Sequence, residues 1–219
     1  NGLVSFEDNF TLNSPNRFFA ATSNGLVSPI SINRVSPVDL YSSSTQADLI
    51  IVTSVSLAPA MTEYVNYRSG QGIAINLVTV DDVMDNFGFG LYDPSAIRDF
   101  LKHSYENYPA PAPSAVLFVG DANYDFLDHL GTGVPNIVPA YVFEFDRTLS
   151  DDNYVYFGQY GLVDSDTSYF GGDRGFDMIS ARWPVNSAGE INSIVAKIKS
   201  YESPNNFDSW RSNIALVAD

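Results

Sequence analysis

The sequence predicts an α/β protein with a mostly parallel sheet and flanking helices. Short apolar, β-branched runs alternate with helical patterns of roughly 10–15 residues, the spacing of βαβ units. Several of these runs also end in polar residues, as in Val116-Leu-Phe-Val-Gly-Asp121. Buried parallel strands deliver side chains to the rim of a sheet in this way. We expect strands near residues 48–54, 73–80, 115–119, 177–182 and 213–218.

Residues 1–46 follow a different pattern from the rest. Residues 3–10 and 17–21 are typical of short strands separated by an Asn-Ser-Pro-Asn turn, and Ser-Pro pairs follow. We therefore predict a β-rich segment and connector over 1–46 and an α/β unit over 47–219.

The helices between the strands carry recognisable start signals. Asp93 is a suitable N-cap and Pro94 suits a first helical position. Ser187 and Glu190 have capping-box spacing. We expect helices near 59–69, 93–105 and 187–202, with a short helix or turn at 81–85.

The segment from 121 to 176 is long and irregular, with expected strands at 136–143 and 154–157. Irregular segments of this length in compact domains are usually functional.

Composition limits the function classes. The chain has 219 residues, 45% of them hydrophobic, so it can bury a core. Its formal charge of −15 repels phosphate backbones and favours cations. The absence of cysteine excludes a disulfide or a thiol nucleophile within these residues. No apolar run reaches the ~18 residues of a membrane span. The many Asn, Ser, Thr and Tyr residues suit an exported bacterial surface protein.

Carboxylates provide the candidate site residues. Asp121 follows a predicted strand through Gly120 and suits either a metal or catalytic role or a turn cap. Asp173 and Asp177 lie in a glycine-containing approach to the next strand. They suit either a shared hard cation such as calcium or a solvated acidic turn.

Other motifs give weaker indications of function. Ser150-Asp-Asp-Asn-Tyr154 suits a substrate-orienting loop, although a simple turn is the commoner outcome. The sequence lacks the Gly-x-Ser-x-Gly elbow of α/β hydrolases and a complete dinucleotide fingerprint.

Taken together, residues 47–219 resemble the gingipain-type cysteine peptidases, peptidase family C25. The resemblance is carried by five stretches and by the helix 190–202 with the strand after it. The stretches are Asp48-Leu-Ile-Ile-Val-Thr, Asp93-Pro-Ser-Ala-Ile-Arg-Asp-Phe-Leu, Val116-Leu-Phe-Val-Gly-Asp121, Ser150-Asp-Asp-Asn-Tyr and Ile179-Ser-Ala-Arg-Trp-Pro-Val-Asn. Residues 1–46 resemble the β-rich segment that often precedes this domain.

The resemblance implies a caspase-like fold of two side-by-side subdomains. This chain would supply the first subdomain and the opening strand of the second. The family's catalytic His and Cys lie after that strand, so no catalytic role is carried over. The resemblance also implies a calcium site. Its ligands would be the carboxylates of Asp121, Asp173 and Asp177 and backbone oxygens of Phe170 and Gly175.

Two functions remain open. The chain is either the amino-terminal portion of a secreted cysteine peptidase or a non-catalytic, calcium-stabilised surface or adhesion module of an exported bacterial protein. In the first case its partner is the remainder of the peptidase domain. The isolated chain is expected to be inactive, because thiol attack needs a cysteine beside a base.

Overall fold

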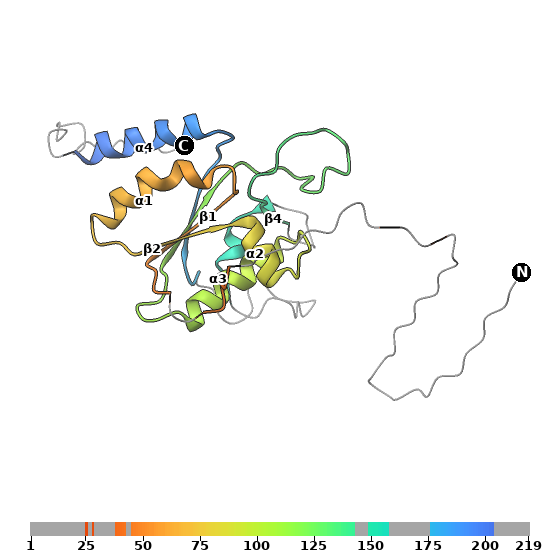
Figure 1. The fold of residues 1–219 in the computed structure, drawn as a ribbon, viewed down its shortest axis with the longest axis horizontal. Helices are drawn as coiled ribbons and strands as arrows, with labels where there is room; N and C mark the ends of the chain where they lie inside the picture. Colours follow the sequence, from red (N-terminus) through yellow and green to blue (C-terminus); the bar gives the residue numbers. More distant parts are fainter. Residues whose placement is uncertain are drawn as a thin grey trace, which may run out of the picture. The chain divides into compact units, whose positions relative to one another are not determined.

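The computed structural model describes residues 38–42, 45–142, 149–157 and 176–203, together with Gly25 and Ser28. Its centre is a four-stranded sheet in the order β2-β1-β3-β6 (Figure 1). The strands are β1 (Leu49–Thr53), β2 (Ile75–Thr79), β3 (Ala115–Val119) and β6 (Ile179–Trp183). All three pairings are parallel, which confirms the predicted α/β class.

The strand order places a topological switch point between β1 and β3. The chain leaves β1 toward β2 on one side and then returns past β1 to form β3 on the other. Crevices at the carboxyl ends of such strands are the usual ligand sites of open α/β sheets. The edge formed by the carboxyl ends of β1, β3 and β6 is called the carboxyl edge below.

Helices cover both faces of the sheet (Figure 1). One face carries η2 (Ala58–Met61), α1 (Thr62–Ser69) and α4 (Ala188–Glu202). The other carries α2 (Val80–Phe87) and α3 (Ser95–Asn107). The central strands β1 and β3 are therefore buried on both sides, which explains their continuous apolar sequences.

Of the two predicted helix starts, that of α4 matches the structure and that of α3 is shifted. The Ser187 hydroxyl accepts from the Glu190 N–H, and the Glu190 carboxylate accepts from the Ser187 N–H, so the capping box is confirmed. The start predicted for α3 is shifted by one residue: Pro94 is the N-cap and Ser95 the first helical residue, while the Asp93 carboxylate still accepts from the Ser95 N–H at 2.9 Å. The helix expected at 59–69 starts as the 3₁₀ turn η2, and α2 is longer than the predicted turn at 81–85.

Residues 38–42, expected to belong to the connector, pack on α2 and α3. Leu40 is buried in the core, and the Tyr41 ring stacks on Phe87 with centroids 4.4 Å apart. Asn86 accepts from the Leu40 N–H and donates to the Val38 carbonyl. The chain divides into residues 1–36 and 37–219. The predicted strands at 3–10, 17–21 and 213–218 lie outside the described residues.

Two expected strands differ from the structure. Of the run expected at 136–143, the structure describes residues 136–142, and within these the strand is β4 (Tyr141–Val142), which pairs antiparallel with β5 (Leu149–Ser150). The strand expected at 154–157 is wrong, because this stretch continues from the 3₁₀ turn η3 (Asp152–Tyr154) as irregular chain. Its apolar residues are buried against the α2–α3 face, so burial rather than strand pairing accounts for their pattern.

Candidate functional site

Asp121 lies at the carboxyl edge, as the sequence predicts. Its N–H donates to the Val185 carbonyl at 3.0 Å, which ties the chain after β3 to the chain after β6. Its carboxylate accepts from the Ala122 N–H at 2.9 Å and from Asn186 Nδ2 at 3.3 Å. The side chain therefore holds the turn that leaves β3.

Gly120 makes this turn possible. Its φ is 150°, and an added Cβ would lie 2.4 Å from Ile137 Cγ2. The backbone amide of Gly120 still donates to the Trp183 carbonyl at 3.0 Å. Only a residue without a side chain lets β3 end this close to the returning chain.

Asp177 lies at the opposite end of the sheet. It precedes β6, and the Ile179 N–H donates to the Ser114 carbonyl just before β3. The Asp177 carboxylate accepts from the Phe157 N–H at 2.7 Å. Asp177 thus holds the chain after η3 beside the start of β6.

The structure does not bring Asp121 and Asp177 together. Pairing between β3 and β6 runs from Ala115↔Ile179 to Val119↔Trp183, with Asp177 before it and Asp121 after it. The paired segment alone is about 13 Å long at roughly 3.3 Å per residue. Calcium ligands at about 2.3–2.6 Å cannot be that far apart. The predicted set that joins both side chains on one ion is therefore wrong in this arrangement.

The remaining predicted ligands, Phe170, Asp173 and Gly175, lie outside the described residues. Among the residues that the structure does describe, no group of three His, Cys, Asp or Glu side chains is placed to hold a metal ion. Calcium binding stays a prediction.

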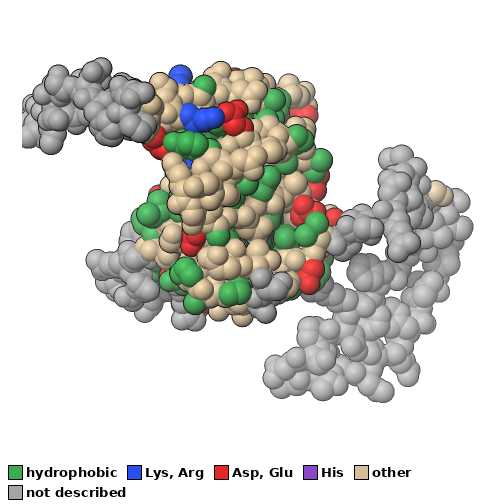
Figure 2. Space-filling model, turned by 60° about the vertical axis from the view of Figure 1, so that its left-hand side comes forward, with side chains coloured by type: hydrophobic (Ala, Val, Ile, Leu, Met, Phe, Trp, Pro, Cys, Tyr) green, Lys and Arg blue, Asp and Glu red, His purple; other side chains and the backbone are tan. Residues whose placement is uncertain are grey.

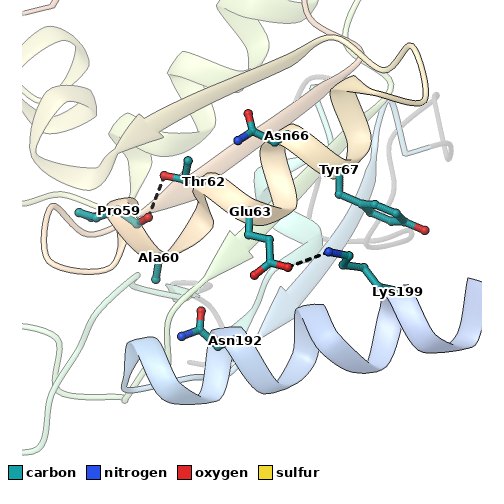
Figure 3. A pocket seen from close by; sticks show the side chains of 8 residues that line it. All are labelled: Pro59, Ala60, Thr62, Glu63, Asn66, Tyr67, Asn192 and Lys199. Carbon is teal, nitrogen blue, oxygen red and sulfur yellow. Dashed lines mark hydrogen bonds and ion pairs between the residues drawn. The ribbon is translucent and has the colours of Figure 1, made fainter.

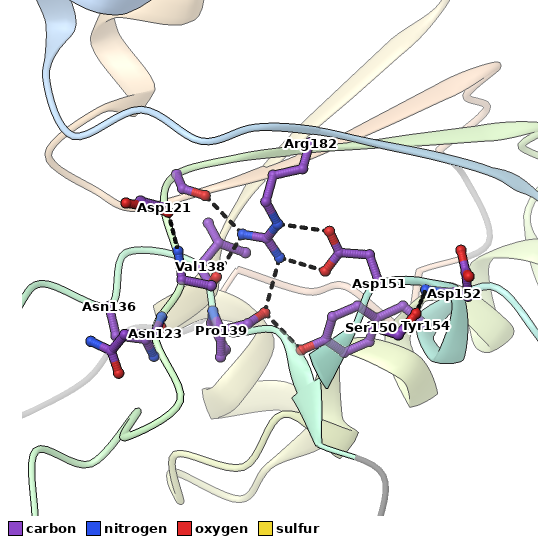
Figure 4. A network of polar contacts seen from close by, with 12 residues as sticks. Asp121, Asn123, Asn136, Val138, Pro139, Ser150, Asp151, Asp152, Tyr154 and Arg182 are labelled. Atoms are coloured by element: carbon purple, nitrogen blue, oxygen red, sulfur yellow. Dashed lines mark hydrogen bonds and ion pairs between the residues drawn. The ribbon is translucent and has the colours of Figure 1, made fainter. Parts of the chain in front are cut away.

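Arg182 is the centre of the polar network at the carboxyl edge (Figure 4). Its side chain is 13% exposed, and its Nε and Nη2 donate to the two carboxylate oxygens of Asp151 at 2.7 Å each. This two-point geometry matches the planar fork of a guanidinium to a carboxylate. The pair joins β6 to the chain between β5 and η3.

The other donors of Arg182 bind backbone carbonyls. Nη1 donates to Gly120 O and to Val138 O, both at 2.7 Å, and Nη2 donates to Pro139 O at 3.2 Å. The guanidinium also lies over the Phe118 ring, 5.3 Å from its centroid. One side chain therefore fixes the turn after β3 and the chain at 138–139.

Tyr154 adds a further hydrogen bond to the same network. Its hydroxyl donates to the Pro139 carbonyl at 2.8 Å, and its ring contacts Phe118 and Tyr141. Burial raises the pKa of the Tyr154 phenol well above its usual value, so the group stays a neutral hydrogen-bond donor. The loops at this edge are held by uncharged as well as charged contacts.

The role of Arg182 is not evident from sequence patterns alone. The available signal is an arginine inside an apolar strand, Ile179-Ser-Ala-Arg-Trp183, because a charge at such a position needs a partner. Asp151 belongs to the Ser150–Tyr154 motif, for which a turn was the commoner expectation. The structure shows the turn and adds the ion pair.

A hollow of about 600 Å³ lies between α1 and α4 (Figure 3). The ion pair between Glu63 and Lys199, 2.8 Å long, crosses it. The rest of its lining is mostly amides and hydroxyls, among them Asn66, Asn192 and Thr62. These groups are solvated and do not form an arrangement of nucleophile and base.

Comparison with known proteins decides the family. The sequence pattern of Peptidase family C25 matches residues 42–219. This chain belongs to peptidase family C25. The match covers the whole α/β unit, including Asp121, Asp151 and Arg182. No curated protein matches the chain.

Solved structures share the C25 fold. Dimeric latent PorU from Porphyromonas gingivalis superposes with a TM-score of 0.58 at 23% identity, over 80% of this chain and 17% of that chain. A structure described as a protease has a TM-score of 0.52 at 18% identity, over 78% of this chain and 31% of that chain. The C25 chain described here thus spans less than a third of each.

Within the described part of this C25 chain, no helix combines the length and apolar character that crossing a bilayer requires.

Proposed function

We propose that this chain is the amino-terminal portion of the catalytic domain of a secreted, gingipain-like cysteine peptidase. The observation that carries the proposal is the C25 match over residues 42–219, on a chain that spans 17% and 31% of its solved neighbours. The 219 residues contain no cysteine. The thiolate nucleophile and its base would therefore come from a later part of the full-length protein.

In this proposal the chain holds other parts of the peptidase domain in place and supplies no reacting group itself. The Asp151–Arg182 pair and the carbonyls of Gly120, Val138 and Pro139 hold the loops of the carboxyl edge in one arrangement. Rigid loops at this edge would give the catalytic half of the domain a fixed surface to pack on. Catalytic groups must be held within about 0.5 Å of the productive geometry.

The second candidate is a non-catalytic, calcium-stabilised surface or adhesion module of an exported bacterial protein. The chain's charge of −15 favours this candidate. Asp and Glu side chains recur across the face shown in Figure 2, whereas Lys and Arg side chains gather in one place. Such a surface would attract divalent cations.

One experiment separates the two functions. The sequence after residue 219 of the full-length protein is read for a His-Gly pair and a cysteine at a strand end. That protein is then assayed for peptide cleavage with and without a Cys→Ala substitution. Thiol-dependent cleavage, absent from the 219-residue chain, supports the peptidase. A full-length protein without the cysteine, or with cleavage that survives its replacement, favours the module.

A further inference from the structure

We infer that residues 122–136 form a rigid docking loop, whose apolar side binds the part of the peptidase domain that follows this chain. In Figure 1 the loop is the green segment between β3 and β4. Its two ends meet, because the Asp121 carbonyl accepts from the N–H groups of Ile137 and Val138 at 2.9 and 3.3 Å. Compact loops closed in this way are frequently functional.

The loop is held from within by its polar side chains. The Asp125 carboxylate accepts from the N–H groups of His129 and Leu130 at 2.9 and 2.7 Å. Asp128 Oδ1 accepts from the Gly133 N–H at 3.1 Å. Asn123 Nδ2 donates to the Val134 carbonyl at 2.8 Å. The acidic groups are thus turned onto the backbone of the loop.

Backbone conformation and one aromatic contact add to this rigidity. Asp128, Gly131 and Gly133 have φ values of 51°, 64° and 64°, the left-handed region that Gly and Asp tolerate best. The Phe126 ring stacks on Tyr92 with centroids 6.1 Å apart, which joins the loop to the chain before α3. The loop is preorganised, so a partner would not have to order it.

While both of its acidic side chains accept hydrogen bonds within the loop, the loop presents apolar side chains to solvent. Tyr124, Leu127, Leu130 and Val134 are 53%, 49%, 77% and 54% exposed. Three of them, Tyr124, Leu127 and Leu130, line an open hollow of about 390 Å³ together with Val142. Single exposed apolar residues are normal on a protein surface, but a cluster on a rigid loop marks an interaction site.

The occupant that best fits this surface is the polypeptide of the same domain. The C25 chain spans 17% and 31% of its solved neighbours, so most of such a protein would lie outside these residues. The charge of −15 disfavours nucleic acid and anionic lipid as partners.

The base of the loop also joins the polar network. Val138 O and Pro139 O, which follow the loop, accept from Arg182. The loop is therefore anchored at its base to the network that holds the carboxyl edge. This inference rests on the proposed function for the identity of the partner.

Side-chain labelling by hydroxyl radicals tests the docking. We expect Leu127 and Leu130 to be labelled freely in the 219-residue chain and several-fold more slowly in the full-length protein. Phe89, which is 89% exposed at the turn between α2 and α3, is the control residue. Labelling requires no peptidase activity, so a failure of the docking inference can be told apart from a failure of the proposed function. Equal labelling of both leucines in the two proteins overturns the inference.

Substitution provides the second test. Leu127→Ser with Leu130→Ser is expected to leave the melting temperature of the isolated chain unchanged and to lower that of the domain in the full-length protein. Phe89→Ser is expected to change neither. Unchanged melting of the full-length double variant overturns the inference. Slower labelling that appears in the isolated chain as its concentration rises also overturns it, in favour of a second copy of the chain.

Discussion

Arg182 and Asp151 form a two-point ion pair at 2.7 Å between β6 and the turn at η3, with side chains only 13% and 21% exposed. The residues are far apart in sequence, so the pair fixes tertiary rather than local structure. The same guanidinium also binds three backbone carbonyls. Its loss would remove this donor from the Asp151 carboxylate and from the carbonyls of Gly120 and Val138, whereas the Pro139 carbonyl would keep the Tyr154 hydroxyl.

We expect Arg182→Gln to lower the free energy of unfolding by about 3 kcal/mol, because removing one partner leaves the other charge buried. Chemical denaturation of the 219-residue chain measures this. The matched control is Lys199→Gln, which breaks an exposed ion pair with Glu63 and is expected to cost less than about 1 kcal/mol. Similar losses for the two variants would contradict a special role for the network.

Gly120→Ala tests the close approach at the end of β3. The new Cβ would meet Ile137 Cγ2 at 2.4 Å, and the backbone φ of 150° adds strain. We expect a loss of about 3 kcal/mol from overpacking and strain together. Gly72→Ala is the control, since φ there is 85° with no atom within 4 Å, and about 1 kcal/mol is expected. Equal losses would show that the contact with Ile137 relaxes freely.

The contact between α1 and α4 predicts an acid-dependent loss of stability. Hydrogen bonds from Arg68 lower the pKa of the Glu202 carboxyl, and Arg68 Nη2 lies 2.9 Å from Glu202 Oε1. A lowered folded-state pKa means that the stabilisation is complete above the unfolded value of about 4.3. It is lost as pH falls through the folded pKa.

We therefore expect the stability difference between the chain and Glu202→Gln to be constant near neutral pH and to shrink below about pH 4.3. Thermal melting across this pH range measures it. Glu106→Gln, at an exposed pair with Lys102, is the control and is expected to stay near the unmodified chain. A difference for Glu202→Gln that grows toward acid would contradict the assignment.

The elements that sequence patterns predicted correctly carry their signals locally. β1 and β3 are compact apolar runs bounded by polar residues, and burial on both faces requires that composition. The capping box of α4 needs only the spacing of Ser187 and Glu190. In each case the residues that decide the structure are close together in the chain.

The site depended on information that is not local. Asp121 and Asp177 both border apolar strands, but one follows its strand and the other precedes it. In a parallel sheet those two positions lie at opposite ends of the strands, so the two carboxylates cannot share one site. The stretch Tyr154–Phe157 has strand-like composition, yet its side chains are buried by packing on the α2–α3 face. Its partners cannot be read from nearby residues.

The same geometry sharpens the calcium prediction. We propose that calcium is bound at the start of β6 by Asp173 and Asp177, with backbone oxygens of Phe170 and Gly175, and without Asp121. Asp177 supports this because it places a carboxylate beside the start of β6. Oxygen-rich sets of this kind suit a hard cation.

Melting temperatures of the 219-residue chain in calcium and in EDTA test the site. At a calcium concentration of about 100 times Kd, binding adds about 2.7 kcal/mol, which raises the melting temperature by several degrees. Asp173→Asn is expected to remove most of this increment, whereas Asp121→Asn should keep it. Asp177→Asn also weakens the bond to Phe157, so its response to calcium is compared rather than its absolute stability. A response abolished by Asp121→Asn but kept by Asp173→Asn would move the site to the carboxyl edge, and no response at all would rule calcium out for this chain.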